Sequence, residues 1–258
     1  GGTLTSSGAV AITNSFSQTA GTVTTTGSGS HLAITQDTGD LSWVSLTSGG
    51  NLTVTSPGKT IFGDTTVGGN VLSTTAGAGA AGGVAQATGS LVVTGTSTFI
   101  ADTGTSQNAV LTQADNDFQG LVSFINTNSG SWLNIDIVDS GSLTLGDITA
   151  SGNLDATAQT NLILDGDVSA DTLDLIATNG EIDQTGGELT VTTGPTNLTA
   201  ATDITLESAT NDFNGVVNAS GADVTVLDAN TLTLGDITAT GNLDATADTD
   251  LVLNGNVS

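Results

Sequence analysis

The chain has 258 residues, of which 26 are acidic and only Lys59 is basic, so its formal net charge is −25. Because binding to a phosphate backbone or an anionic lipid surface needs clustered Lys and Arg, this charge excludes nucleic acids and membrane surfaces as partners. Cysteine is absent, which excludes disulfide bonds, thiolate nucleophiles and cysteine zinc sites. No apolar run approaches the roughly 18 residues of a membrane span, so no membrane insertion is expected.

The composition predicts an ordered, nearly all-β chain. Thr, Val, Ile and Leu are abundant and the mean hydropathy is +0.16, whereas disordered acidic chains lack such residues. Aromatic residues make up only 3% of the chain, so we expect Leu, Val, Ile and Ala to fill the core.

Residues 1–110 repeat loosely and contain the only histidine, His31, and the only lysine. Ser28 and Ser30 lie near His31 along the chain, but such proximity is not the geometry of a catalytic triad. Lys59 follows the turn-forming pair Pro57 and Gly58. We therefore interpret both His31 and Lys59 as surface residues.

A Gly/Ala-rich stretch over residues 76–83 predicts a loop that leaves the regular structure. Residues 77–82 formally match the G-x-G-x-x-G dinucleotide pattern. That pattern binds a pyrophosphate only where a helix follows, and here a strand-like segment follows instead. No cofactor-binding site is predicted.

Residues 111–258 contain a long internal repeat. Residues 142–169 and 231–258 are identical at 21 of 28 positions, at an offset of 89 residues. Residues 116–122 resemble residues 211–217 at an offset of 95, so six extra residues are expected in a surface loop near residues 126–131.

A shorter period of about 20 residues lies within the long repeat. Apolar runs begin at Leu143, Leu162 and Ile182, and again at Phe213, Leu232 and Leu251. Secondary runs begin at Leu154, Leu173, Val224 and Leu243. This period predicts a parallel β-helix, a single continuous β-solenoid over residues 1–258, with coils of about 20 residues.

A string of immunoglobulin-like sandwiches, and with it tandem Ca²⁺-binding adhesin domains, is the alternative, because 90 residues is about one such domain. Such a sandwich usually has a buried Trp and a corner Tyr, but Tyr is absent and Trp43 and Trp132 lie outside the best repeat.

The carboxylates predict no catalytic residue. Glycoside hydrolysis needs two neighbouring acidic groups, and the sequence shows no adjacent Asp pair. Asp165 and Asp167 are weak candidates for Ca²⁺ ligands, since Ca²⁺ accepts oxygen ligands from turns. The second copy of the repeat has Asn254 and Asn256 instead, which favours simple solvated charge.

The phrases NDFNGVV, TLTLGDITATGNL, EIDQTGGELTVTT and NLTAATDITL resemble the repeat region of bacterial exoproteins of the filamentous-haemagglutinin type. The resemblance covers residues 90–258 and, less closely, the rest. It implies a right-handed parallel β-helix that an outer-membrane transporter exports by two-partner secretion.

We therefore expect a non-enzymatic, extracellular structural and adhesive fibre segment at the bacterial surface or in the biofilm matrix. Its partners would be surface polysaccharide, other cells or copies of itself. A self-assembling filament or surface-layer subunit is the alternative.

Ice binding is a third possibility, and it requires Thr-x-Thr pairs that recur at the coil period. Thr231 and Thr233 match Ser142 and Thr144, but the sequence shows no such pair in every coil.

Overall fold

The computed structural model describes residues 2–77, 82–104 and 106–258, and all the regular elements in these ranges are β-strands. Described strand pairs run parallel and join residues of successive coils, which confirms the predicted all-β solenoid. The sandwich alternative is wrong, since sandwiches consist of antiparallel sheets. Residue contacts divide the chain into two compact units, 1–140 and 141–258. Continuity of one solenoid over residues 1–258 stays a prediction.

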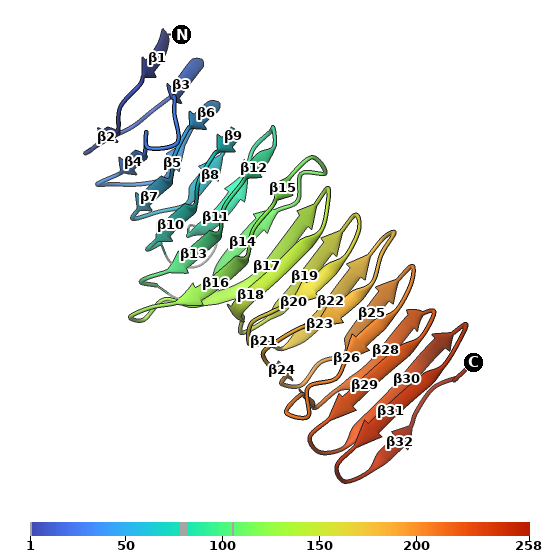
Figure 1. The fold of residues 1–258 in the computed structure, drawn as a ribbon. Helices are drawn as coiled ribbons and strands as arrows, with labels where there is room; N and C mark the ends of the chain where they lie inside the picture. The colour runs from blue at the N-terminus through green and yellow to red at the C-terminus, as the bar shows by residue number, and fades with distance from the viewer. Residues whose placement is uncertain (1, 78–81, 105) are drawn as a thin grey trace. The chain divides into compact units, whose positions relative to one another are not determined.

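Three parallel sheets form the first unit (Figure 1). Sheet A contains β1 (Gly2–Ser6), β3 (Gly21–Thr25), β6 (Ser45–Ser48), β9 (Asp64–Val67), β12 (Leu91–Val93) and β15 (Asp117–Phe118). Sheet B contains β2 (Val10–Ile12), β4 (Leu32–Thr35), β7 (Leu52–Ser56), β10 (Val71–Thr75), β13 (Ser97–Ala101) and β16 (Val122–Asn126). Sheet C contains β5 (Leu41–Ser42), β8 (Thr60–Phe62), β11 (Gly83–Gln86), β14 (Gln107–Leu111) and β17 (Trp132–Asp139).

Coil length varies in the first unit. Leu52 pairs with Val71, and Val71 pairs with Ser97, so the second of these two coils is clearly longer than the first. The additional residues lie in the connections between strands, and the strand registers stay in step. This variation explains why the period is hard to detect before residue 110.

Two connections in the first unit bear on the sequence predictions. The stretch over residues 76–83 includes residues 78–81, which lie outside the described residues, and β11 begins at Gly83. A strand therefore follows the G-x-G-x-x-G match, as expected. The surface loop predicted near residues 126–131 is confirmed, because it connects β16 to β17 and Asn128 is exposed.

A stack of aromatic rings fills part of the first unit's core. Trp43, Phe62, Phe99, Phe124 and Trp132 are all buried. Successive ring centroids along this series lie 4.9, 6.1, 4.9 and 5.5 Å apart. The expectation of a purely aliphatic core is wrong here, because parallel register brings rings from distant coils into contact and a few aromatic residues suffice.

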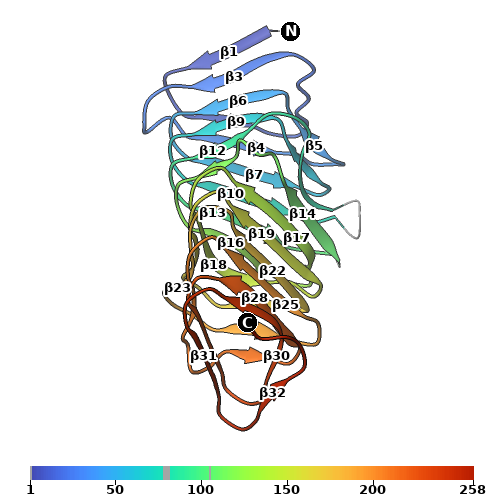
Figure 2. The same cartoon turned by 90° about the vertical axis from the view of Figure 1, so that its right-hand side faces the viewer.

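The strands of the second unit also run parallel, and their pairing divides them into three groups, called sheets D, E and F here, of which D and E are joined through the β18–β21 pair (Figure 2). Sheet D contains β18 (Leu143–Thr149), β20 (Leu162–Leu164), β23 (Ile182–Gln184), β26 (Ile204–Leu206), β29 (Val224–Asp228) and β31 (Leu243–Ala247). Sheet E consists of the short strands β21 (Val168–Ala170), β24 (Leu189–Val191) and β27 (Asp212–Phe213). Sheet F contains β19 (Asn153–Ala158), β22 (Thr172–Ala177), β25 (Thr196–Ala200), β28 (Val216–Gly221), β30 (Leu232–Ala239) and β32 (Leu251–Leu253).

Most of the predicted columns of apolar residues are confirmed. Leu143 pairs with Leu162 and Leu162 with Ile182. Leu232 pairs with Leu251, whereas Phe213 pairs with Val191 in sheet E, so Phe213 and Leu232 do not share a column although they are one period apart. Equal spacing along the chain does not identify the side of the coil on which a strand lies.

The two copies of the repeated phrase lie in different sheets. Leu143 starts β18 in sheet D, and its equivalent Leu232 starts β30 in sheet F. Their local pairing is the same, because Ile148 lies opposite Val168 and Ile237 opposite Val257. Sheets D and F therefore accept the same strand, since both need apolar side chains at alternate inward positions.

Four buried hydroxyl groups have no hydrogen-bond partner within the described part of the chain: those of Thr60, Ser73, Ser97 and Thr196. Thr196 lies between Leu173 and Val217 on the neighbouring strands, in an otherwise apolar column. An unpaired buried hydroxyl loses its hydration without compensation, so it lowers the stability of the folded state.

We therefore expect Thr196→Val to raise the free energy of unfolding by about 1 kcal/mol, because the replacement keeps the shape and removes the orphan group. Thr199→Val on the exposed side of the same strand is the control, with an expected change below about 0.5 kcal/mol. Denaturant unfolding measures both. A loss of stability in Thr196→Val would show that this hydroxyl has a partner.

Candidate functional site

Asn and Asp side chains cap the corners of the coils. The Asn51 Oδ1 atom accepts a hydrogen bond from the backbone N–H of Asn70, and Asn70 Oδ1 accepts one from Thr96, each at 3.0 Å. Corner N–H groups lie outside the regular strand ladder, so they need a separate acceptor. The side chain of one coil thus pairs with the backbone of the next.

Asp165 and Asp167, the weak Ca²⁺ candidates, lie at such a corner. Asp167 Oδ1 accepts the Glu188 N–H at 3.1 Å, and the Asp167 N–H donates to Asp147 Oδ1 at 3.2 Å. The Thr185 hydroxyl donates to Asp165 Oδ1 at 3.3 Å. Their carboxylates are thus engaged in hydrogen bonds between coils.

The second copy of the repeat keeps this arrangement without the candidate carboxylates. The Asn256 N–H donates to Asp236 Oδ1 at 2.9 Å, as Asp167 does to Asp147. Within residues 2–77, 82–104 and 106–258, no three His, Asp or Glu side chains gather as a metal site would require. The hydrogen bonds of Asp165 and Asp167 are those of corner caps, and Ca²⁺ binding by these residues stays a prediction.

His31 and Lys59 lie in similar corner positions. His31 Nδ1 accepts the Asn51 N–H at 2.8 Å. The imidazole thus caps a backbone N–H at this corner, as the Asn51 side chain caps that of Asn70 in the next coil. The backbone N–H of Lys59 donates to Asp40 Oδ1 at 2.9 Å. His31 is exposed, as predicted, and Lys59 is half-buried.

The repeated Asn-Asp-Phe phrase forms a buried clamp in each unit, which sequence analysis did not identify. In the second unit, Asn211 exchanges hydrogen bonds of 2.8 Å with the Gln184 side chain and accepts the Leu189 N–H at 2.9 Å. The Phe213 N–H donates to the buried Asp228 carboxylate at 3.0 Å. Side chains from three coils thereby fix one corner.

The first unit repeats the clamp. Asn116 pairs with the Gln86 side chain and accepts the Leu91 N–H at 2.9 Å. The Phe118 N–H donates to the buried Asp139 carboxylate at 2.7 Å. Recurrence of the phrase in the two halves of the chain was the signal that could have identified these residues as a structural set.

Removing the clamp asparagine should destabilise the fold. We expect Asn211→Ala to lower the free energy of unfolding by about 2 kcal/mol, because the buried Leu189 N–H loses its side-chain acceptor and the Gln184 amide loses two of its hydrogen bonds. Asn214→Ala, at an exposed position nearby, should cost less than about 1 kcal/mol. Equal losses in thermal or denaturant unfolding would contradict the clamp.

A polar row follows the outward side of sheet F. Asp155, Asp174, Asn197 and Asn218 lie in register on β19, β22, β25 and β28. The Asn218 amide donates to Asn197 Oδ1 at 2.9 Å. We call these four residues the amide row.

The structure brings Asp155 and Asp174 together, although a whole coil separates them in sequence. Burial raises the pKa of the Asp174 carboxyl, and the negative charge of Asp155 raises it further. Like charges opposite each other on neighbouring strands destabilise a sheet. The absence of an adjacent pair in the sequence therefore did not exclude a pair in space.

Replacing Asp174 should stabilise the protein at neutral pH. A raised folded-state pKa means that the charged form is disfavoured. Because Asp174 is partly exposed and solvent screens its charge, Asp174→Asn should add only about 0.3 kcal/mol to the free energy of unfolding at pH 7. The gain should vanish as the pH falls through the pKa of Asp174 to below about 3.9, where the wild-type carboxyl is protonated.

Thermal melts at pH 7 and pH 3.5 measure this difference. Asp183→Asn is the matched control, since Asp183 faces outward on β23 with Ile163 and Thr205 as its strand neighbours. A gain that persists at pH 3.5 would rule out charge as its cause.

A shallow hollow of about 280 Å³ lies next to the amide row. Its lining includes the amide-row residues Asn197 and Asn218, together with Thr199, Ser220, Thr238 and Asp236. These side chains offer hydroxyl, amide and carboxylate groups on an outward strand surface. Such groups can exchange hydrogen bonds with the hydroxyls of a polysaccharide.

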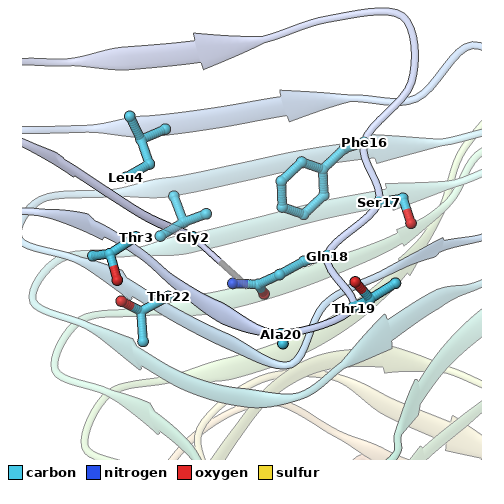
Figure 3. A pocket seen from close by; sticks show the side chains of 10 residues that line it. Gly2, Thr3, Leu4, Phe16, Ser17, Gln18, Thr19, Ala20 and Thr22 are labelled. Atoms are coloured by element: carbon cyan, nitrogen blue, oxygen red, sulfur yellow. The ribbon is translucent and has the colours of Figure 1, made fainter.

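A larger hollow of about 450 Å³ lies beside β1 and β3, with Leu4, Phe16 and Gln18 around it (Figure 3). The Gln18 amide donates to the carbonyls of Gly21 and Ser45, and its oxygen accepts the N–H groups of Val44 and Ser45. Gln18 is therefore occupied in holding strands together and is not available to orient a ligand.

No helix in the described ranges could span a membrane. The family described as repeats of unknown function (DUF5649) matches residues 49–125 and 159–220, which together make up more than half of the chain. Neither a curated protein nor a solved structure matches the chain. The comparisons thus support a repeat protein and assign no activity.

Proposed function

We propose that the chain, which belongs to the family of repeats of unknown function DUF5649, is a non-enzymatic, adhesive segment of an extracellular bacterial fibre. The observation that carries the proposal is the amide row with its adjoining hollow. It presents hydrogen-bonding groups in fixed register on an outward surface, while the inward residues hold the strands in place.

The stacked architecture supports the structural part of this function. Strands are hydrogen-bonded to strands of the preceding and following coils, and the corners are capped by side chains. Such a repeat is stabilised by its neighbours, so the surface can vary while the scaffold persists. Rigid spacing of surface groups favours weak contacts with a repetitive ligand such as a polysaccharide.

The engagement of the carboxylates supports a non-enzymatic function. Asp147, Asp167 and Asp236 accept backbone N–H groups at corners, and Asp139 and Asp228 do so in the clamps. A general acid or base needs a proton-transfer path to a substrate, and these carboxylates bind backbone instead.

Within the same proposal, the chain is of the filamentous-haemagglutinin type, with an outer-membrane transporter as its export partner. The phrases EIDQTGGELTVTT, NLTAATDITL and NDFNGVV lie inside the matched segment 159–220. The lack of cysteine is compatible with a chain that crosses a membrane unfolded before it forms its strands.

A glycan array and a cell-binding assay test the adhesive function. We expect binding to at least one polysaccharide, weakened roughly tenfold or more in Asn197→Ala because the outward amide group is lost. Asn218 is left unchanged, since its Oδ1 atom accepts the Asp236 N–H at 2.9 Å and its amide donates to Asn197. Thr225→Ala, on the outward side of β29 in sheet D, is the control and should bind like the wild type. Failure of the wild type in both assays would refute adhesion.

A further inference from the structure

The outward side of four consecutive strands of sheet A is a regular array of threonines. One row consists of Thr5, Thr24, Thr47 and Thr66, which are paired in register on β1, β3, β6 and β9. A second row, two residues earlier on each strand, consists of Thr3, Thr22, Ser45 and Asp64. We call the seven Thr and Ser residues of these two rows the threonine face.

Thr-x-Thr pairs occur on two successive coils of the first unit, Thr3 with Thr5 and Thr22 with Thr24, and they are one coil period apart in the sequence. The next two coils carry Ser-x-Thr and Asp-x-Thr instead. The step from Thr24 to Thr47 is longer than the period, so only the pairing of the strands shows that the rows continue onto β6 and β9.

The hydroxyls of this face are available to solvent. Within the described ranges, no hydrogen bond to protein engages the side chains of Thr5, Thr24, Thr47 and Thr66, which are exposed or half-exposed. Ser142 and Thr231, which the sequence analysis considered for ice binding, do not have free hydroxyls. The Ser142 hydroxyl is hydrogen-bonded to the Thr160 hydroxyl, and the Thr231 hydroxyl to that of Thr249.

The geometry of the array is set by the backbone. Strands of a sheet lie about 4.8 Å apart, and side chains two residues apart on one strand are separated by about 6.7 Å. These pairings have no register shift, so the two repeats continue over four strands. Both repeats lie close to the spacings of water oxygens on the prism face of ice.

Threonine suits such a surface. Its branched Cβ restricts the side chain to few rotamers, so the hydroxyl and methyl groups keep their positions without a large loss of entropy on binding. A rank of hydroxyls can take positions in a water lattice, and the methyls between them are favourably removed from liquid water.

The charge distribution around the threonine face also bears on its ability to order water. Residues 2–36 contain no acidic or basic side chain except His31, in a chain whose net charge is −25. Charged groups hold their own hydration shells and would disturb an ordered water layer. The part of the threonine face on β1 and β3 lies in this uncharged stretch. Its part on β6 and β9 lies beyond residue 36, and the charged Asp64 ends the second row.

We propose that the threonine face binds the surface of ice crystals. The amide row in the second unit offers amide and carboxylate groups suited to sugar hydroxyls, whereas this face offers only hydroxyls and methyls at lattice spacings. The four strands themselves carry no aromatic residue, and Phe16 lines the hollow beside β1 and β3 together with Thr3 and Thr22. The ice-binding site is therefore distinct from the proposed adhesive surface.

Inhibition of ice recrystallisation and ice-affinity partitioning test the proposal with the whole chain. We expect the wild type to partition into a growing ice front and to keep ice grains small. Thr24→Tyr and Thr47→Tyr place a bulky ring at the centre of the face and should each raise the concentration needed for inhibition roughly tenfold or more. Thr225→Tyr is the matched control, because Thr225 faces outward on a central strand of sheet D, and it should act like the wild type.

Melting temperatures of all four proteins establish that they are folded, and Thr24→Ser gives a milder second test that keeps the hydroxyl and removes only the methyl. Partial loss in Thr24→Ser, together with strong loss in both Tyr variants, supports the site. Absence of inhibition by the folded wild type overturns the proposal. Equal loss in Thr225→Tyr overturns it as well, since inhibition would then not depend on this face.

Discussion

The parallel, in-register hydrogen bonding between coils is the interaction on which the rest of the structure depends. Strands take their backbone partners from the coils before and after them, so residues of the same column face one another at the strand spacing. Columns of leucine, stacked rings and rows of threonine all follow from this single constraint. Changes in coil length are tolerated because they fall in the connections and leave the columns aligned.

The corners show how the acidic residues are used. A chain with 26 carboxylates and one lysine cannot balance them with ion pairs. Several carboxylates instead accept backbone N–H groups that the strand ladders leave unpaired. Each of these charge-assisted hydrogen bonds stabilises the corner at which it forms. Asp174 is an exception, because it faces Asp155 on the next strand and gains no such partner in the amide row.

The inward and outward residues of each strand therefore have separate functions. Inward residues hold neighbouring coils together, and replacements there change stability. Outward residues have few structural duties, so their chemistry can differ from sheet to sheet without loss of the fold. The threonine face and the amide row are two results of this freedom, and the ligands that we propose for them differ: ordered water and a polysaccharide.

The repeat phrases predicted the all-β solenoid, its coil length and the columns Leu143–Leu162–Ile182 and Leu154–Leu173, because apolar alternation and period are properties of the chain itself. They could not place Phe213, since the side of the coil on which a strand lies depends on how the connections bend. The clamp residues Gln184, Asn211 and Asp228 were likewise hidden by their separation along the chain.

The sequence by itself determined which residues alternate, how often the chain turns back on itself, and that no disulfide can form. Only the tertiary structure decided which residues become neighbours across coils: the ring stack, the Asp155 and Asp174 pair, and the two rows of the threonine face. The physical reason is that these neighbours are joined through the register of hydrogen bonds between strands. Connections of unequal length set that register, and a constant period cannot express it.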